Sequence, residues 1–113
     1  MEHDKRPWGE YWVLEDAETH KVKKVLVEQG GRLSLQYHKF RSEVWTIVSG
    51  VATVTIEGEV KEYNVGEVAY IPQGALHRIA NYRDKPLIFI EVQYGTYFGE
   101  DDIIRVEDDY SRE

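Results

Sequence analysis

The sequence predicts an all-β fold, a sandwich or a barrel, made of eight or so short strands. Glycine-containing turns separate short segments that are rich in valine, isoleucine and threonine. No segment carries a sustained apolar repeat at helical spacing. The 113 residues suffice to bury one modest core but not two, so we expect a single domain.

The expected strands follow one another along the chain with a turn signal at almost every junction. Val22–Glu28 is rich in valine and is followed by a break at Gly30-Gly31. Val51–Glu57 alternates apolar and polar residues with the period of a half-buried strand, and Glu57-Gly58-Glu59 then indicates a hairpin turn. The other expected strands are Leu33–His38, Val44–Ser49, Val60–Asn64, Glu67–Ile71, His77–Asn81 and Leu87–Tyr94.

Two terminal segments flank this barrel, which we expect over about residues 20–95. An N-terminal arm of about residues 1–15 includes a strand over Glu10–Glu15, whose edge is open to pairing with a neighbouring subunit. A C-terminal tail of about residues 96–113 is acidic, and such a run is typical of a solvated surface segment.

Charge and composition exclude several classes of partner and site. The formal net charge of −7 argues against nucleic acid or an anionic membrane as the main partner, because both require a basic surface. A few local cations can still bind one phosphate group. The chain has no cysteine, so disulfides and thiolate metal sites are excluded. No apolar run is long enough to span a membrane and no secretory signal is present, so we expect a cytoplasmic location.

Four side chains form a candidate metal site. Gln36 and His38 are two residues apart, so a strand would place both on one face. Glu43 follows across a short bend, and the Pro72–Gly74 turn delivers His77 at the start of the next strand. Two imidazoles and a carboxylate, with an amide oxygen as an optional fourth ligand, suit zinc, and also manganese, cobalt, nickel or iron(II), with positions left open for water or substrate.

The spacing of these residues matches both signatures of the cupin superfamily. In the first, Gly30 precedes Gln36 and His38, then Glu43, and Gly50 closes the pattern. The second runs through Gly66, Pro72, Gly74, His77 and Asn81. The resemblance implies a single cupin domain, a jelly-roll-like barrel also called a double-stranded β-helix.

A narrower resemblance covers nearly the whole chain. Its segments are Arg6-Pro7-Trp8-Gly9, Leu33-Ser34-Leu35-Gln36, Ile71-Pro72-Gln73-Gly74, Ile90-Glu91-Val92-Gln93 and Gly99-Glu100-Asp101-Asp102-Ile103. They resemble, in the same order, the type II mannose-6-phosphate isomerase domain, which in many bacteria is the C-terminal part of a bifunctional mannose-1-phosphate guanylyltransferase. The guanylyltransferase portion is not in this sequence, so GDP-mannose synthesis is not expected.

The resemblance implies a metal-dependent isomerase that interconverts mannose 6-phosphate and fructose 6-phosphate through an enediol. Gln36 is a usual ligand in that family, and Arg41 corresponds to an arginine thought to matter for isomerisation. We take Lys23, Arg78 and Arg105 as candidates for binding the phosphate. No general base is identified, and Tyr70 and Lys39 are guesses.

Two other functions stay open. Two histidines and one carboxylate also suit an iron(II) site for dioxygen chemistry. A non-catalytic module that binds metal and sugar is favoured by Phe40 and Val44, which stand where the family usually has histidine. For any of these functions we expect a homodimer, because exposed strand edges in a small all-β chain favour partners.

Overall fold

The valine-rich segment predicted at Val22–Glu28 forms strand β3, His20–Val27, in which every second side chain is buried. This computed structural model describes residues 2–110, so Met1 and residues 111–113 of the predicted arm and tail lie outside the described residues. The same alternation recurs in β10, Leu87–Gly95. Each of these strands therefore has one face toward the interior and one toward the surface.

Eleven strands are present among the described residues, and all their pairings are antiparallel. The expected strands all form, with ends that differ by at most a few residues. The other strands are β1 His3–Arg6, β2 Gly9–Asp16, β4 Leu35–Tyr37, β5 Arg41–Ser49, β6 Ala52–Ile56, β7 Glu59–Tyr63, β8 Val68–Ile71, β9 His77–Ala80 and β11 Ile104–Glu107.

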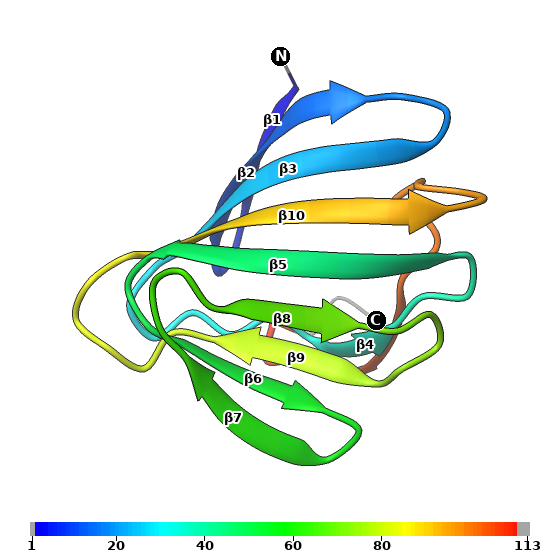
Figure 1. The fold of residues 1–113 in the computed structure, drawn as a ribbon. Coiled ribbons are helices and arrows are strands. Elements are labelled where there is room, and N and C mark those ends of the chain that lie inside the picture. The colour runs from blue at the N-terminus through cyan, green and yellow to red at the C-terminus, as the bar shows by residue number, and fades with distance from the viewer. Residues whose placement is uncertain (1, 111–113) are drawn as a thin grey trace.

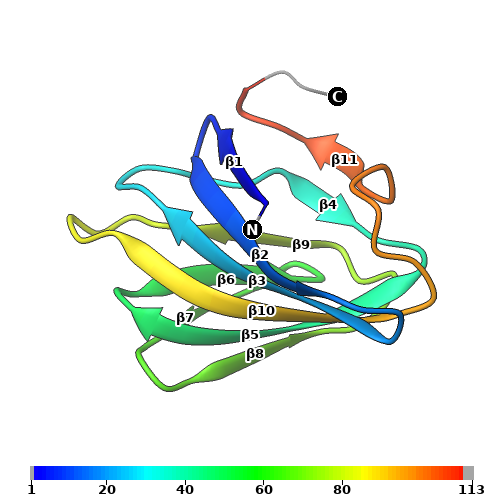
Figure 2. The ribbon, with the colours of Figure 1, turned by 90° about the horizontal axis from the view of Figure 1, so that it is seen from above.

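The strands form two sheets that lie against each other as the layers of a barrel (Figure 1). The six-stranded sheet has the order β1-β2-β3-β10-β5-β8, and the five-stranded sheet has the order β11-β4-β9-β6-β7. Seen from above, β3, β10 and β5 lie on one side and β4 and β9 on the other (Figure 2). No helix in residues 2–110 is long and apolar enough to cross a membrane.

The two terminal segments both join the sheets. β2 pairs with β1 and β3 of its own chain, so both of its edges are occupied without a neighbouring subunit. In the tail, β11 pairs with β4, and the Arg32 side chain donates two hydrogen bonds to Asp109, at 2.6 and 2.7 Å. The part of the acidic tail that the structure describes is therefore docked against the barrel.

The apolar core fills only one end of the barrel. Val25 and Val27 of β3, and Leu87 and Phe89 of β10, point into it. At the other end of the same two strands the inward positions are polar, and Lys23 is one of them, at 5% exposure. Gly50 makes the tight turn between β5 and β6 with φ of 82°, where a Cβ would lie 2.7 Å from the Pro86 carbonyl oxygen. The polar end contains the candidate site.

Candidate metal centre

Three of the four predicted ligands converge inside the barrel. His38 follows β4, Glu43 lies in β5 and His77 begins β9. One ligand atom from each lies within 4.8 Å of the other two. All three residues are at most 3% exposed, so the cluster is formed by the fold and not by mobile surface groups.

Backbone carbonyls determine which nitrogen of each imidazole is free. The Nδ1 atom of His38 lies 2.8 Å from the Asp102 carbonyl oxygen, and that of His77 lies 2.9 Å from the Ala75 carbonyl oxygen. Since a carbonyl only accepts, both Nδ1 atoms carry the proton and donate. Both Nε2 atoms are then bare acceptors, and both are buried without a hydrogen-bond partner. This is the arrangement that holds an imidazole ready for a metal.

The Nε2 atom of His38 faces the Glu43 carboxylate at 3.2 Å. A bare imidazole nitrogen and a carboxylate oxygen are both acceptors, so this approach is unfavourable unless a cation lies between them. Burial is the main reason why the pKa of each imidazole falls below its ordinary value. Both rings are therefore neutral at neutral pH, which is the form that binds a metal ion. The residues present fit a divalent cation.

Two hydrogen-bond donors stabilise the charged form of Glu43, one at each carboxylate oxygen. Arg41 Nε donates to one of its oxygens at 2.9 Å, and Trp45 Nε1 donates to the other at 3.0 Å. Burial alone would raise the pKa of Glu43, but positive charge at His38 and Arg41 lowers it well below its usual range. The guanidinium is charged at every relevant pH, so its contribution persists when His38 is neutral.

Gln36 is placed to complete the set. It pairs in register with His77 across β4 and β9, so the two side chains share a face. Gln36 lines the same cavity as His38 and Glu43. Its Oε1 atom accepts a hydrogen bond from Ser34 Oγ at 3.0 Å, which leaves one lone pair for a further partner.

The cavity beside these ligands holds about 580 Å³ of empty space, part of it open to solvent. Arg41, Lys23 and Arg105, all predicted from the sequence, line it. Lys23 Nζ lies 4.3 Å from the centre of the Tyr11 ring. The other lining residues are Arg6, Trp8, Tyr11, Val25, Leu33, Ser34, Trp45, Phe89, Glu91, Gln93, Glu100 and Ile103.

Arg78 is the predicted phosphate ligand that the structure does not bring to this cavity. It follows His77 in β9 and its side chain points to the other face. Its Nε atom donates to the Leu33 carbonyl at 2.8 Å, and its Nη2 atom donates to the Glu107 carbonyl at 3.3 Å. Arg78 thus ties the C-terminal strand to the barrel.

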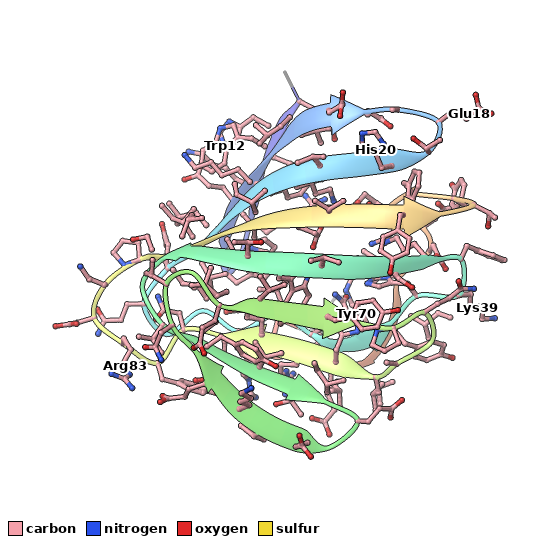
Figure 3. The ribbon with its side chains drawn as sticks, viewed as in Figure 1. Trp12, Glu18, His20, Lys39, Tyr70 and Arg83 are labelled. Atoms are coloured by element: carbon pink, nitrogen blue, oxygen red, sulfur yellow. The ribbon has the colours of Figure 1, made fainter. Side chains whose placement is uncertain are left out.

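Tyr70 and Lys39 also lie away from the cavity lining. Tyr70 is 51% exposed on the outer side of β8, and Lys39 is exposed in the loop between β4 and β5 (Figure 3). The positions where the family usually has histidine are outside as well. Phe40 is exposed and packs edge-on against Tyr97, and Val44 alternates with the inward-pointing Glu43. The absence of histidine at these two positions therefore removes no group from the cavity.

Sequence reasoning gave no role to three acidic side chains that act at the site. Glu91 lines the cavity, and burial, aided by the nearby Glu43 carboxylate, raises its pKa to about 8. Glu100 also lines the cavity and forms an ion pair with Lys23 at 2.6 Å. Asp102 accepts hydrogen bonds from the backbone amides of Lys39 and Phe40, both at 3.0 Å. All three acids belong to segments that carry the family resemblance, and this resemblance was the signal that could have identified them.

Comparison with known proteins identifies the family of this chain. Residues 2–108 match the sequence model of a family described as mannose-6-phosphate isomerase C-terminal. The mannose-1-phosphate guanylyltransferase ManC of Salmonella typhimurium is 47% identical over 107 residues, which is 95% of this chain and 22% of that protein. The alginate biosynthesis protein AlgA of Pseudomonas aeruginosa is 46% identical, over 95% of this chain and 22% of its own length. The chain thus spans less than a quarter of these relatives.

Solved structures support the predicted barrel. Lactobacillus farciminis oxalate decarboxylase has a TM-score of 0.80 and 26% identity, covering 93% of this chain and 33% of that one. A Klebsiella pneumoniae protein with a double-stranded β-helix domain has a TM-score of 0.74 and 23% identity, covering 85% of this chain and 77% of that one. The predicted cupin-type fold is confirmed.

Proposed function

Because this chain belongs to the family of mannose-6-phosphate isomerase C-terminal domains, we propose that it is a metal-dependent isomerase interconverting mannose 6-phosphate and fructose 6-phosphate. The observation that carries the proposal is the presence of two complementary groups at the polar end of the barrel, beside one cavity. One is the ligand set of His38, Glu43 and His77, and the other is the pair of buried cations Lys23 and Arg41. An aldose–ketose isomerase needs positive charge at the carbonyl oxygen and a cation for the phosphate.

His38, Glu43 and His77, with Gln36 as a fourth ligand, would hold one divalent ion. When bound, the ion supplies charge that polarises the substrate carbonyl. The mixed nitrogen and oxygen donors suit zinc first, and also manganese, cobalt, nickel or iron(II). A four-coordinate zinc keeps one position open for the sugar if Gln36 stays outside the ligand set, and a metal with a higher coordination number keeps positions open beside all four ligands.

The chain's own side chains supply the rest of the chemistry. Arg41 is fixed against Glu43 and is placed to donate to the oxygen on which negative charge develops in the enediolate. Lys23 and Arg105 line the same cavity and are the candidates for the phosphate. The carboxyl group of Glu91 lines the cavity outside the metal set and accepts a hydrogen bond from Gln93 at 2.6 Å. By this position we assign Glu91 the proton that moves between C1 and C2.

The test is an assay of protein reconstituted in parallel with zinc, manganese, cobalt, nickel and iron(II). Each form receives mannose 6-phosphate, and fructose 6-phosphate is followed by a coupled reaction. We expect turnover that requires metal and disappears in His77→Ala. Stoichiometric metal binding with no turnover for any metal would contradict the isomerase.

Glu91→Gln tests the assigned proton carrier with the same assay. We expect kcat to fall by about a hundredfold or more, in the range typical of lost acid–base catalysis, while KM and metal content stay close to wild type. A variant that retains wild-type kcat would remove Glu91 from the mechanism.

A second candidate function has a specific observation in its favour. His38, His77 and Glu43 have the composition of the two-histidine, one-carboxylate site of iron(II) oxygenases. Oxygen uptake by the iron(II) form with a sugar substrate, without isomerisation, would favour this reading. The binding-module reading is weakened because Phe40 and Val44 both lie outside the cavity lining.

A further inference from the structure

Three cationic side chains point into the polar end of the barrel. Lys21 and Lys23 occupy inward positions of β3, and Arg41 begins β5. Each is less than a tenth exposed, at 7%, 5% and 3%. Burying three positive charges close together is strongly unfavourable unless an anion accompanies them.

Arg41 is paired with Glu43 of the metal centre at 2.9 Å, and the anion that accompanies the two lysines is the carboxylate of Glu100. One of its oxygens lies 2.6 Å from Lys23 Nζ. Burial alone would raise the pKa of Glu100, but Lys23, Arg41 and Lys21 together lower it. The side chain of Glu100 is still 34% exposed, compared with 6% for that of Lys23. Glu100 therefore reaches the cations from the open end of the cavity.

The segment that carries Glu100 connects β10 to β11 and is attached by polar contacts. The Thr96 amide donates to the Phe40 carbonyl at 2.9 Å, and Arg41 Nη1 donates to the Gly99 carbonyl at 3.2 Å. Lys21 Nζ donates to the Phe98 carbonyl at 3.5 Å. No residue of 96–103 belongs to the apolar core cluster. Withdrawal of Glu100 would leave the packed core intact.

We propose that Lys21 and Lys23 form the site for the phosphate group of the substrate, with Arg41 between this site and the metal centre, and that Glu100 is an internal occupant which the phosphate displaces. The inference rests on the proposed function, because it takes the ligand to be a phosphate monoester. A phosphate carries nearly two negative charges and three acceptor oxygens, whereas the carboxylate carries one charge and two oxygens. The two lysines, with the charge of Arg41 beside them, therefore favour the phosphate over Glu100.

Arg41 connects this anion site to the metal centre. Its Nε atom donates to Glu43 while its Nη1 atom donates to the segment that carries Glu100. A sugar phosphate bound with its phosphate at the cations thus directs its other end toward Glu43 and His38. The release of Gly99 and Glu100 would also free the donors of Arg41 for the substrate.

The experiment measures binding of inorganic phosphate by calorimetry, which needs no turnover. Glu100→Gln removes the competing charge and keeps the size of the side chain. Glu62→Gln removes one charge from a surface pair with Arg83 and is the matched control for net charge. Lys23→Met combined with Glu100→Gln removes one proposed phosphate ligand together with the carboxylate paired with it, and thermal unfolding checks that each variant is folded.

We expect Glu100→Gln to bind phosphate about tenfold more tightly or better, the size expected for one hydrogen bond to a charged group. We expect Glu62→Gln to match wild type and the double variant to lose binding. Unchanged or weaker binding in folded Glu100→Gln would overturn the proposal, as would retained binding in the double variant. Phosphate binding as expected without turnover would support this anion site and contradict only the isomerase.

Discussion

At the scale of single residues, the spacing of residues along the sequence identifies some of the groups in the site. It does not identify the others. The signature spacing of His38, Glu43 and His77 is sufficient to predict that they converge, because each follows a defined bend or turn. Lys23 and Glu91 lie in strands whose buried and more exposed positions alternate, but whose apolar and polar residues do not. The sequence of such a strand does not show which face is inside. At this end of the barrel polar side chains point inward because the cavity provides partners for them.

His77→Ala should sharply reduce metal binding. The substitution removes one of the two bare Nε2 atoms of the ligand set. Loss of a residue that only hydrogen-bonds to a metal ligand already lowers metal affinity by about 10- to 100-fold. We therefore expect at least a hundredfold weaker binding, measured by metal competition against a chelator. His20→Ala, which removes a surface histidine paired with Glu15, is the control. Equal metal affinity in the two variants would exclude His77 as a ligand.

At the scale of elements, β4 and the loop after it depend on the tail. Asp102 holds this loop by the backbone amides of Lys39 and Phe40, and its own carbonyl orients His38. The sequence predicts the barrel strands well because their valine-rich alternation is a strong local signal. It misses β1 and β11 because four-residue strands among charged residues resemble solvated segments, and only pairing with β2 and β4 stabilises them.

Asp102→Ala should loosen this loop and weaken metal binding without touching a ligand. Loss of the two amide contacts frees the backbone that positions His38, and we expect roughly a 10- to 100-fold loss of metal affinity. Asp101→Ala changes the exposed neighbour, which accepts a hydrogen bond from Tyr97, and should keep wild-type affinity. Metal affinity that is insensitive to both changes would show that the tail does not support the site.

The same connecting segment should make stability depend on pH in the acid range. The folded pKa of Glu100 lies below its ordinary value, so the folded state binds fewer protons there than the unfolded state. The contribution of Glu100 is complete above the ordinary value of about 4.3 and is lost as the pH falls below it. We expect melting temperatures to fall less between pH 6 and 3.5 in Glu100→Gln than in wild type. An equal fall in melting temperature in the variant and in wild type would contradict this dependence on Glu100.

At the scale of the whole molecule, the outer face of the six-stranded sheet is the surface we expect to pair with a second copy of the chain. The outward positions of β3, β10, β5 and β8 are mostly apolar, in a chain with a net charge of −7. Four strands of up to nine residues cover roughly 600 Å², close to the ~800 Å² per partner of a stable interface. The apolar members are Val22, Leu26, Val44, Val48, Val68, Tyr70, Ile88, Ile90, Val92 and Tyr94.

Charge introduced on this face should separate a homodimer. Val48 and Val68 are 45% and 51% exposed, so Val48→Glu and Val68→Glu leave the core undisturbed while they place like charges opposite each other in a two-fold interface. Light scattering after gel filtration should give a dimer for wild type and a monomer for the variants. Val60→Glu, at a 64% exposed position on β7, should remain a dimer. A monomeric wild type would contradict the interface.

The division of the barrel interior into an apolar end and a polar end has a consequence for how the chain tolerates change. Backbone amides near Val27, Ile47 and Leu87 should exchange with solvent only on global unfolding, because they belong to the fully buried core. Amides near Lys21 and Gln93 lie beside charged side chains and should exchange through smaller local openings. Substitutions that alter ligand preference therefore fall at the polar end and leave the apolar core residues unchanged.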